Sequence, residues 1–339
     1  MKIIFNSLTA FYGDGTALME LITAFIYSIF NLELAIELAF GAFSLIGYYY
    51  IINLGKIRST NGILLLLYFP STFFWFSTIS KDLIIFVVIC GYLYHTYQIV
   101  ILLNKSCFKN ILFNMSFILL WIMLGYAIRP WIIYILICST FLWVLLILLI
   151  NSTHIYKKII GTFSLVLMSL LLLLKYESFT NLLMSNSSSS AKFFTGGSAL
   201  ALFKLQDPVD YLILGPFYSA MTLFEPFIHQ INRSTGITYD FAIISNLLLF
   251  LIILAGIVFY IKNKTTTISS DNNKDNYYNV SYYLFIFVSI YLLAYLPFLR
   301  SNLGTAFRFK SVITPLILCI VIRVFEKHSR EQRNLNLHE

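Results

Sequence analysis

The fold class is decided by residues 111–150, which read ILFNMSFILLWIMLGYAIRPWIIYILICSTFLWVLLILLI and contain one charged residue, Arg129. A helix that crosses a bilayer needs about 20 mostly apolar residues. Two such helices fit here, over 111–128 and 131–150, and only Arg129 and Pro130 separate them. This stretch therefore predicts two membrane-spanning helices joined by a tight hairpin.

The composition of the whole chain agrees with that prediction. Of its 339 residues, 59% are hydrophobic and 11% are charged, and the mean hydropathy is +0.82. A soluble domain carries about 25% charged residues. A water-facing surface cannot be built from so few charged side chains. The composition thus excludes a soluble globular fold.

We predict an all-α, polytopic integral membrane protein that forms a single membrane domain over 1–339. Nine segments are long and apolar enough to span a bilayer. They are residues 34–54, 63–78, 83–103, 111–128, 131–150, 159–174, 242–261, 282–299 and 311–325. For the segments that flank Lys81–Asp82 and Arg129–Pro130, broken or re-entrant helices are the alternative.

The orientation follows from the loops. If nine spans alternate, most of the 23 Lys and Arg residues fall on one side, which the positive-inside rule assigns to the cytoplasm. The N-terminus is then outside and the C-terminus is cytoplasmic. The formal net charge of +8 is accordingly interpreted as a topology signal, and no nucleic acid is expected as a partner.

Three parts lie outside the predicted spans: an outer N-terminal segment 1–33, a long outer loop 175–241 and a cytoplasmic tail 326–339. Within the first part, an apolar stretch around Glu20 predicts an interfacial helix, with a tenth span as the alternative. No secretory signal is recognisable, so the first span is expected to direct insertion. The outer loop is much longer than a usual connection and is a candidate functional loop.

Charged residues near membrane depth are costly and point to candidate functional positions. Asp14 lies in the sequence YGDGT, where two glycines allow a turn that holds one carboxylate. Such a carboxylate is suited to act as a general base at the outer surface. The alternative is that Asp14 only begins a helix and complements its dipole.

Lys81 and Asp82 follow a segment rich in aromatic residues that contains Pro70. Two interpretations remain open for this pair. Either the two charges neutralise each other as an interfacial anchor, or Lys81 reaches a phosphate and Asp82 orients it.

Three outer arginines, Arg129, Arg300 and Arg308, run against the positive-inside tendency. The forked guanidinium is suited to bind phosphate. The preferred interpretation is that they bind an anionic lipid-linked group, and the alternative is that they extend to outer-leaflet headgroups. Lys310 lies in the same predicted outer loop.

The four cysteines are far apart and lack the spacing of metal ligands, so they are interpreted as small core residues. No metal site and no cofactor are predicted. The chain has no P-loop, GxGxxG, HExxH or GxSxG motif, which argues against an ATP-driven pump or a serine hydrolase.

Several of these elements together resemble a known class of proteins. The resemblance lies in the aromatic run 69–76, in Ser80–Asp82, in Ile128–Pro130, and in Arg308 before a closing apolar helix with Pro315. The chain resembles bacterial polytopic proteins of surface-polysaccharide assembly. These include O-antigen polymerases and GT-C-type membrane glycosyltransferases. The resemblance implies an enzyme of the bacterial inner membrane that acts at the periplasmic face. Its expected role is in the biosynthesis of surface polysaccharide of the lipopolysaccharide type.

The resemblance also implies a substrate, partners and residue roles. The substrate is an undecaprenyl-diphosphate-linked saccharide, and the partners are this lipid-linked oligosaccharide, membrane lipids and other polysaccharide-assembly proteins. An acidic residue in the first outer loop is the usual catalytic candidate, so Asp14 is expected to act as base, with Arg129 at the same centre. The residues expected to bind the diphosphate are Lys81, Asp82, Arg300, Arg308 and Lys310.

Two other classes of function remain open from the sequence. A polysaccharide transporter or flippase would have charged or broken helices near the middle of the membrane. The predicted spans carry almost no charge there, which favours an enzyme with its site at one face. A non-enzymatic membrane subunit stays as a further alternative.

Overall fold

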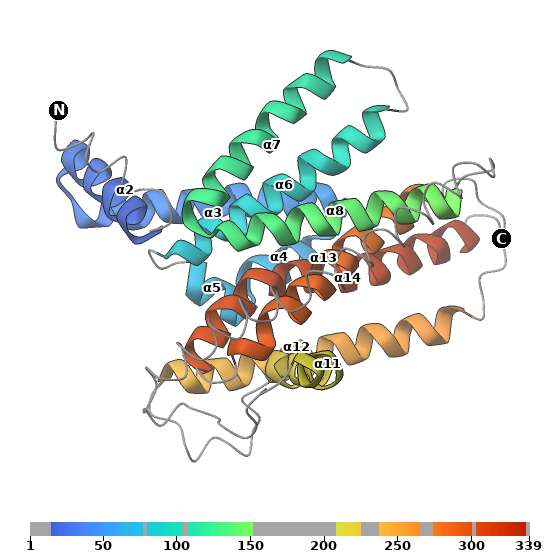
Figure 1. The fold of residues 1–339 in the computed structure, drawn as a ribbon. Coiled ribbons are helices and arrows are strands. Elements are labelled where there is room, and N and C mark those ends of the chain that lie inside the picture. Colours follow the sequence, from blue (N-terminus) through green and yellow to red (C-terminus); the bar gives the residue numbers. More distant parts are fainter. Residues whose placement is uncertain are drawn as a thin grey trace. The chain divides into compact units, whose positions relative to one another are not determined.

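The computed structural model describes residues 15–76, 80–103, 108–151, 208–224, 237–264, 274–299 and 303–336. Every regular element within these ranges is an α-helix (Figure 1). The helices are α2 (Gly15–Phe30), α3 (Glu33–Gly55), α4 (Thr60–Tyr68), α5 (Pro70–Phe76), α6 (Lys81–Leu103), α7 (Phe108–Ile128), α8 (Pro130–Asn151), α11 (Pro208–Phe224), α12 (Ile237–Lys264), α13 (Lys274–Leu299) and α14 (Leu303–Asn336). The all-α prediction is confirmed for the described part of the chain.

Five helices in the described ranges are long and apolar enough to cross a membrane. They are Glu33–Gly55, Lys81–Leu102, Phe108–Ile128, Pro130–Ile147 and Asp240–Ile261. They coincide with five of the predicted spans. Residues 159–174 lie outside the described ranges, and within 282–299 only a shorter apolar stretch, Val280–Ala294, is found. The chain therefore has the helices of a membrane-embedded protein, and the total of nine spans stays a prediction.

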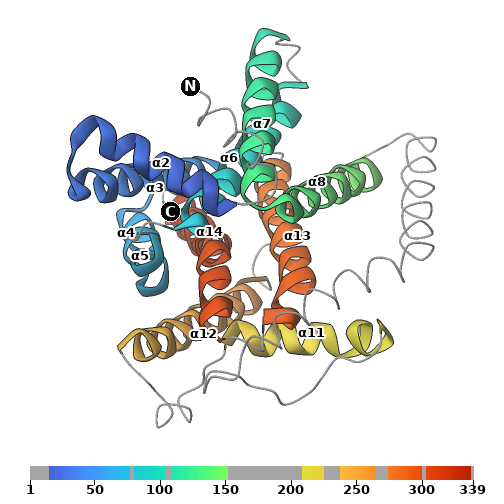
Figure 2. The same ribbon diagram turned by 60° about the vertical axis from the view of Figure 1, so that its left-hand side comes forward.

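One predicted span, over 63–78, is broken in the structure. Helix α4 ends at Tyr68 and α5 begins at Pro70, with the extended residue Phe69 (φ −61°, ψ 127°) between them. Pro70 has no N–H to continue the α4 hydrogen bonds. The carbonyl of Phe69 instead accepts hydrogen bonds from Thr72 Oγ1 and Phe73 N, both at 2.9 Å. Figure 2 shows the two short helices beside α3.

The chain forms two compact units. The first contains Met1–Leu136, Leu248–Ser281 and Ser311–Glu339, and the second contains Ile137–Leu247 and Tyr282–Lys310. Asp82, His95, Arg129 and Arg323 belong to the first unit, and Lys310 belongs to the second.

Helix α6 is the centre of the first unit. Every residue from Asp82 to Leu93 is buried, and α3 and α7 pack against it (Figure 1). Glycines allow these close approaches. A Cβ on Gly47 of α3 would lie 2.5 Å from the ring of Phe86, and one on Gly91 of α6 would lie 2.6 Å from the indole of Trp121. Because the residues from Asp82 to Leu93 are covered by other parts of the protein, their side chains are not in contact with lipid.

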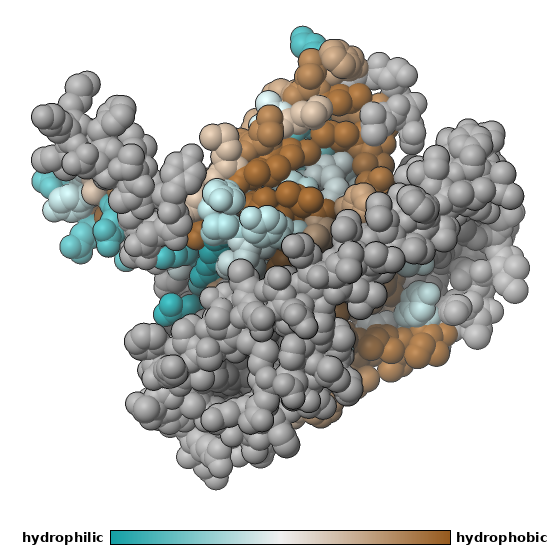
Figure 3. Space-filling model, in the orientation of Figure 1, coloured by the Kyte–Doolittle hydropathy of each residue, from teal (hydrophilic) through white to brown (hydrophobic). Residues whose placement is uncertain are grey.

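Helix α7, in contrast, has one strongly exposed apolar face. Leu112, Phe113, Leu119 and Met123 are all exposed, and hydrophobic side chains cover α7 in Figure 3. Such a face suits contact with lipid chains.

Two charges of α14 hold the turn between α3 and α4. Arg323 is buried, and its Nη1 donates to the carbonyl of Gly55, the last residue of α3, at 2.7 Å. Three residues later Glu326 accepts from Ser59 N at 2.8 Å, Ser59 Oγ at 2.6 Å and Arg58 N at 3.0 Å. A cation thus lies at the C-terminus of α3 and an anion at the N-terminus of α4, which is the favourable arrangement for both helix dipoles.

The glycine contact between α3 and α6 gives a first prediction. Gly47→Ala should lower the free energy of unfolding by roughly 1–3 kcal/mol because the new methyl group displaces the Phe86 ring. Gly41→Ala on the same helix is the matched control, since a Cβ there has no atom within 4 Å. It should be neutral or stabilising by up to about 1 kcal/mol from helix propensity. Thermal unfolding of both variants in detergent tests this, and equal unfolding temperatures would contradict it.

The α14 contact gives a second prediction. Arg323→Met should destabilise the protein by about 2–3 kcal/mol because it removes charge-assisted hydrogen bonds to buried carbonyl groups. Arg58→Met is the control, because the side chain of Arg58 is exposed and only its backbone N–H bonds to Glu326. The two variants are compared by thermal unfolding. If Arg58→Met lost as much stability as Arg323→Met, the loss would not depend on the hydrogen bonds between Arg323 and the buried carbonyl groups.

Candidate functional site

The candidate site is an ion pair in the first unit between Arg129 and Asp82, with Arg129 Nη2 2.7 Å from Asp82 Oδ1. Asp82 lies in the first turn of α6, where its negative charge complements the helix dipole. Ser80 caps this helix: its Oγ accepts a hydrogen bond from Leu83 N at 3.3 Å. The carboxylate is therefore carried by a capped, regular helix.

Arg129 occupies the turn between α7 and α8. Its N–H donates to the carbonyl of Gly125 at 2.8 Å, and its own carbonyl accepts from Ile132 N at 3.1 Å. Pro130 follows at the first position of α8, where its missing N–H costs no hydrogen bond. One turn before Arg129, a Cβ on Gly125 would lie 2.9 Å from Val88 of α6 and 2.6 Å from Ile133 of α8. The small residue lets these helices approach closely beneath the ion pair.

The pair is largely shielded from solvent: the side chain of Asp82 is 4% exposed and that of Arg129 is 17% exposed. Lys81 is adjacent and half-buried. A second cationic residue is thus next in the chain to the carboxylate that pairs with Arg129. A guanidinium has five N–H donors in a fixed fork, so Arg129 can contact a carboxylate on one edge and an anionic ligand on another.

Four further site residues were predicted, namely Asp14, Arg300, Arg308 and Lys310. Asp14 and Arg300 fall outside the described residues. Arg308 is exposed, and Lys310, which belongs to the second unit, is 3% exposed. Lys310 Nζ lies 3.5 Å from the carbonyl of Leu223 and 3.4 Å from Asn246 Oδ1.

Arg308 and Lys310 were predicted to lie in a loop. That prediction was wrong, because α14 begins at Leu303 and contains both residues. Hydropathy locates the apolar part of a helix, and it does not detect that the preceding segment 303–310, which carries Arg308 and Lys310, belongs to the same helix.

The partner of Asp82 in the structure is Arg129. From the sequence, Lys81 was the partner considered for this carboxylate. A signal was available, because two helices joined by the short segment 104–107 run in opposite directions. The start of α6 and the end of α7 must then lie at the same end of the pair.

No group of three or more His, Cys, Asp and Glu side chains in the described ranges is arranged to hold a metal ion. The arrangement at Arg129 suits the binding of an anion through charge-assisted hydrogen bonds.

A double-mutant cycle tests the ion pair. Asp82→Leu and Arg129→Met should each destabilise the protein by about 3–5 kcal/mol, because each leaves one buried charge without its partner. The double variant should be much less destabilised than the sum of the two, since it removes both charges. Lys109→Met, which removes an exposed cation of α7, is the control and should have little effect. Strictly additive changes in unfolding free energy would contradict a direct interaction.

Comparisons of the chain with protein-family models, with curated proteins and with solved structures each give no match.

Proposed function

We propose that the protein is a membrane glycosyltransferase of the surface-polysaccharide polymerase type, which uses undecaprenyl-diphosphate-linked saccharides. The observation that carries the proposal is the arginine Arg129, which is held by the buried carboxylate of Asp82 beside Lys81. In this proposal Arg129 binds the diphosphate of the lipid-linked saccharide.

The charges at this position support binding of a lipid-linked anion. A diphosphate whose lipid chain lies in the membrane presents its charge at the ends of membrane-spanning helices. Arg129 lies at such a position, between the two membrane-spanning candidates Phe108–Ile128 and Pro130–Ile147. Asp82 compensates its charge when no ligand is bound, which lowers the cost of keeping a guanidinium near lipid.

The chemistry of glycosyl transfer assigns roles to the remaining residues of the proposal. The acceptor hydroxyl attacks the anomeric carbon, its proton passes to a base, and the bond from that carbon to the diphosphate oxygen breaks. Asp14 is the proposed base, and Arg129 and Lys81 of the first unit are the proposed cations for the departing diphosphate. Asp82 is an anion itself, so we assign it to positioning Arg129 rather than to contacting the diphosphate. The proposed location is the bacterial inner membrane, with the site and the N-terminus on the periplasmic side.

A transporter or flippase of lipid-linked saccharides is the second candidate. The break between α4 and α5 at Phe69 supports it, because discontinuous helices at membrane depth often form the substrate sites of transporters.

Deletion of the gene in its own host, followed by gel analysis of the surface glycan, separates these functions. A polymerase predicts loss of the ladder, with core plus a single repeat remaining. A transferase that adds one sugar predicts an intact ladder with altered repeat mass. A flippase predicts no repeat on the surface and lipid-linked repeats retained at the cytoplasmic face. An unchanged glycan would contradict all three.

Complementation of the deletion strain tests the site. Arg129→Lys keeps the charge but loses the fork, and we expect at least a tenfold loss of polymer because bidentate phosphate contacts are lost. Arg58→Lys makes the same chemical change at an exposed position in the first unit and should restore the ladder fully. Membrane levels of both variants are measured by immunoblot. Full polymer from a normally inserted Arg129→Lys protein would overturn the site assignment.

A further inference from the structure

A second polar group lies inside the first unit, distant from the ion pair. His95 is buried within the membrane-spanning candidate Lys81–Leu102. It is 13 positions along α6 from Asp82, which corresponds to about 20 Å at the rise of an α-helix. An ionisable side chain at such a position is costly and is a candidate functional group by that fact alone.

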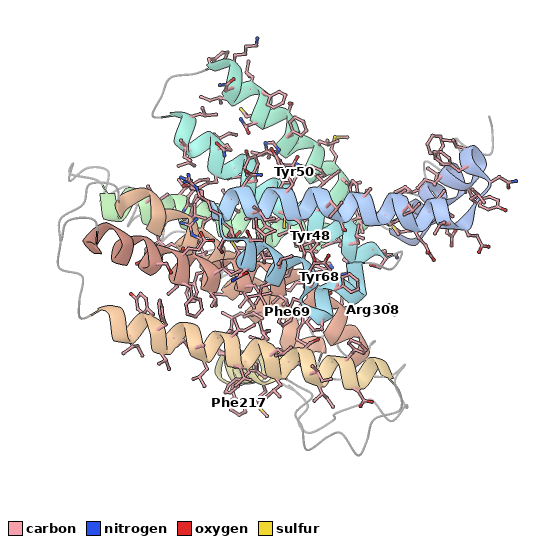
Figure 4. The ribbon with its side chains drawn as sticks, turned by 180° about the vertical axis from the view of Figure 1, so that it is seen from behind. Tyr48, Tyr50, Tyr68, Phe69, Phe217 and Arg308 are labelled. Atoms are coloured by element: carbon pink, nitrogen blue, oxygen red, sulfur yellow. The ribbon has the colours of Figure 1, made fainter. Side chains whose placement is uncertain are left out.

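The imidazole joins three helices through its two nitrogens. Nδ1 lies 2.8 Å from Asn114 Oδ1 of α7, and Nε2 lies 3.3 Å from the hydroxyl of Tyr50 on α3. In Figure 4, Tyr50 lies on the side of α3 that faces α6 and α7. His95 is therefore the common hydrogen-bonding partner of α3 and α7.

The neighbouring contacts fix which nitrogen carries the proton. Asn114 Nδ2 donates to the carbonyl of Asn110 at 2.7 Å, so its Oδ1 is the atom that faces His95. Because Oδ1 only accepts, Nδ1 of His95 must be protonated. In the neutral imidazole Nε2 is then an acceptor, and the hydroxyl of Tyr50 donates to it.

The surroundings of the imidazole are aromatic. Phe117 of α7 stacks on it at 4.8 Å between centroids, and Tyr94 of α6 and Tyr50 of α3 contact it edge-on. Among the residues that the structure describes, the titratable groups that contact His95 are thus these two tyrosines, and the contacts from α7 come from Asn114 and Phe117. Among the described residues, no charged side chain contacts the imidazole.

Protonation changes one of the two hydrogen bonds and leaves the other intact. With both nitrogens protonated, Nδ1 still donates to Asn114, but Nε2 becomes a donor. The hydroxyl of Tyr50 must then accept, and its own proton loses the only hydrogen-bonding partner that the described residues provide. A donor without a partner in an apolar interior is unfavourable.

We infer that His95 is a proton-binding site inside the membrane, and that its protonation loosens α3 from the α6–α7 pair. The ligand is a proton, and the coupled change is the reversal of the hydrogen bond to Tyr50. This inference is independent of the proposed polymerase activity, because the group lies about 20 Å from Asp82 along α6.

Solid-state NMR of histidine-labelled protein in lipid bilayers tests the protonation state. The His95 signal is identified by its loss in His95→Asn. At pH 8 we expect the neutral form with the proton on Nδ1, and at pH 5 the form with both nitrogens protonated. In Asn114→Leu the proton of the neutral form should move to Nε2. A proton on Nε2 of the unmodified protein at pH 8, or an unchanged signal at pH 5, would overturn the inference.

Spin labels test the coupled movement. Tyr49 on α3 and Met123 on α7 are both strongly exposed and can be replaced by labelled cysteines in a background without the native cysteines. The distance between the labels should increase or broaden from pH 8 to pH 5 in the otherwise unmodified protein. In His95→Asn, which binds no proton, it should stay constant. A distance that responds to pH in both proteins, or in neither, would overturn the coupling.

Discussion

A charged side chain that is buried in this protein must find its partner within the protein, because lipid offers no hydrogen bonds. This constraint explains the charges of the first unit. Asp82 is paired with Arg129, Arg323 lies at the carbonyl end of α3, and Glu326 lies at the amide end of α4. Each contact joins segments that are far apart in the sequence. These buried charges therefore link helix ends that are distant in the chain.

Helix α6 determines where these contacts can form. It is covered on several sides, with close approaches at Gly47 and Gly91, so its polar residues face protein rather than lipid. Asp82 and His95 are both carried by this buried helix. Groups on a rigid central element are held more precisely than groups on loops. Helix α6 therefore holds Asp82 and His95 in fixed positions, one at the Arg129 ion pair and one in the contact with α3 and α7.

The proposed substrate fits the electrostatics of the Arg129 site. Without ligand, the carboxylate of Asp82 pairs with the guanidinium of Arg129, and Lys81 is a second cationic residue next to Asp82 in the chain. A diphosphate would bring negative charge to these cations, while its lipid chain stays in the membrane. The helix break at Phe69 and Pro70 lies in the same unit. Because broken helices often form the substrate sites of transporters, transport of lipid-linked saccharides stays as the second candidate function.

The sequence by itself determined the helical class and the five long apolar helices, because the need for about 20 apolar residues per crossing is a local property. It also identified Arg129 and Asp82 as costly residues. The order of the helices brings these two residues to the same end of the α6–α7 pair, but their direct contact was decided by tertiary structure, since it depends on how the two helices pack. The same holds for His95, which hydropathy shows only as one polar residue in an apolar run. The role of Arg323 likewise needed the structure, because its partner Gly55 is 268 residues away in the chain. Local composition fixes which segments enter the membrane, whereas the partners of buried polar groups are fixed by contacts between helices.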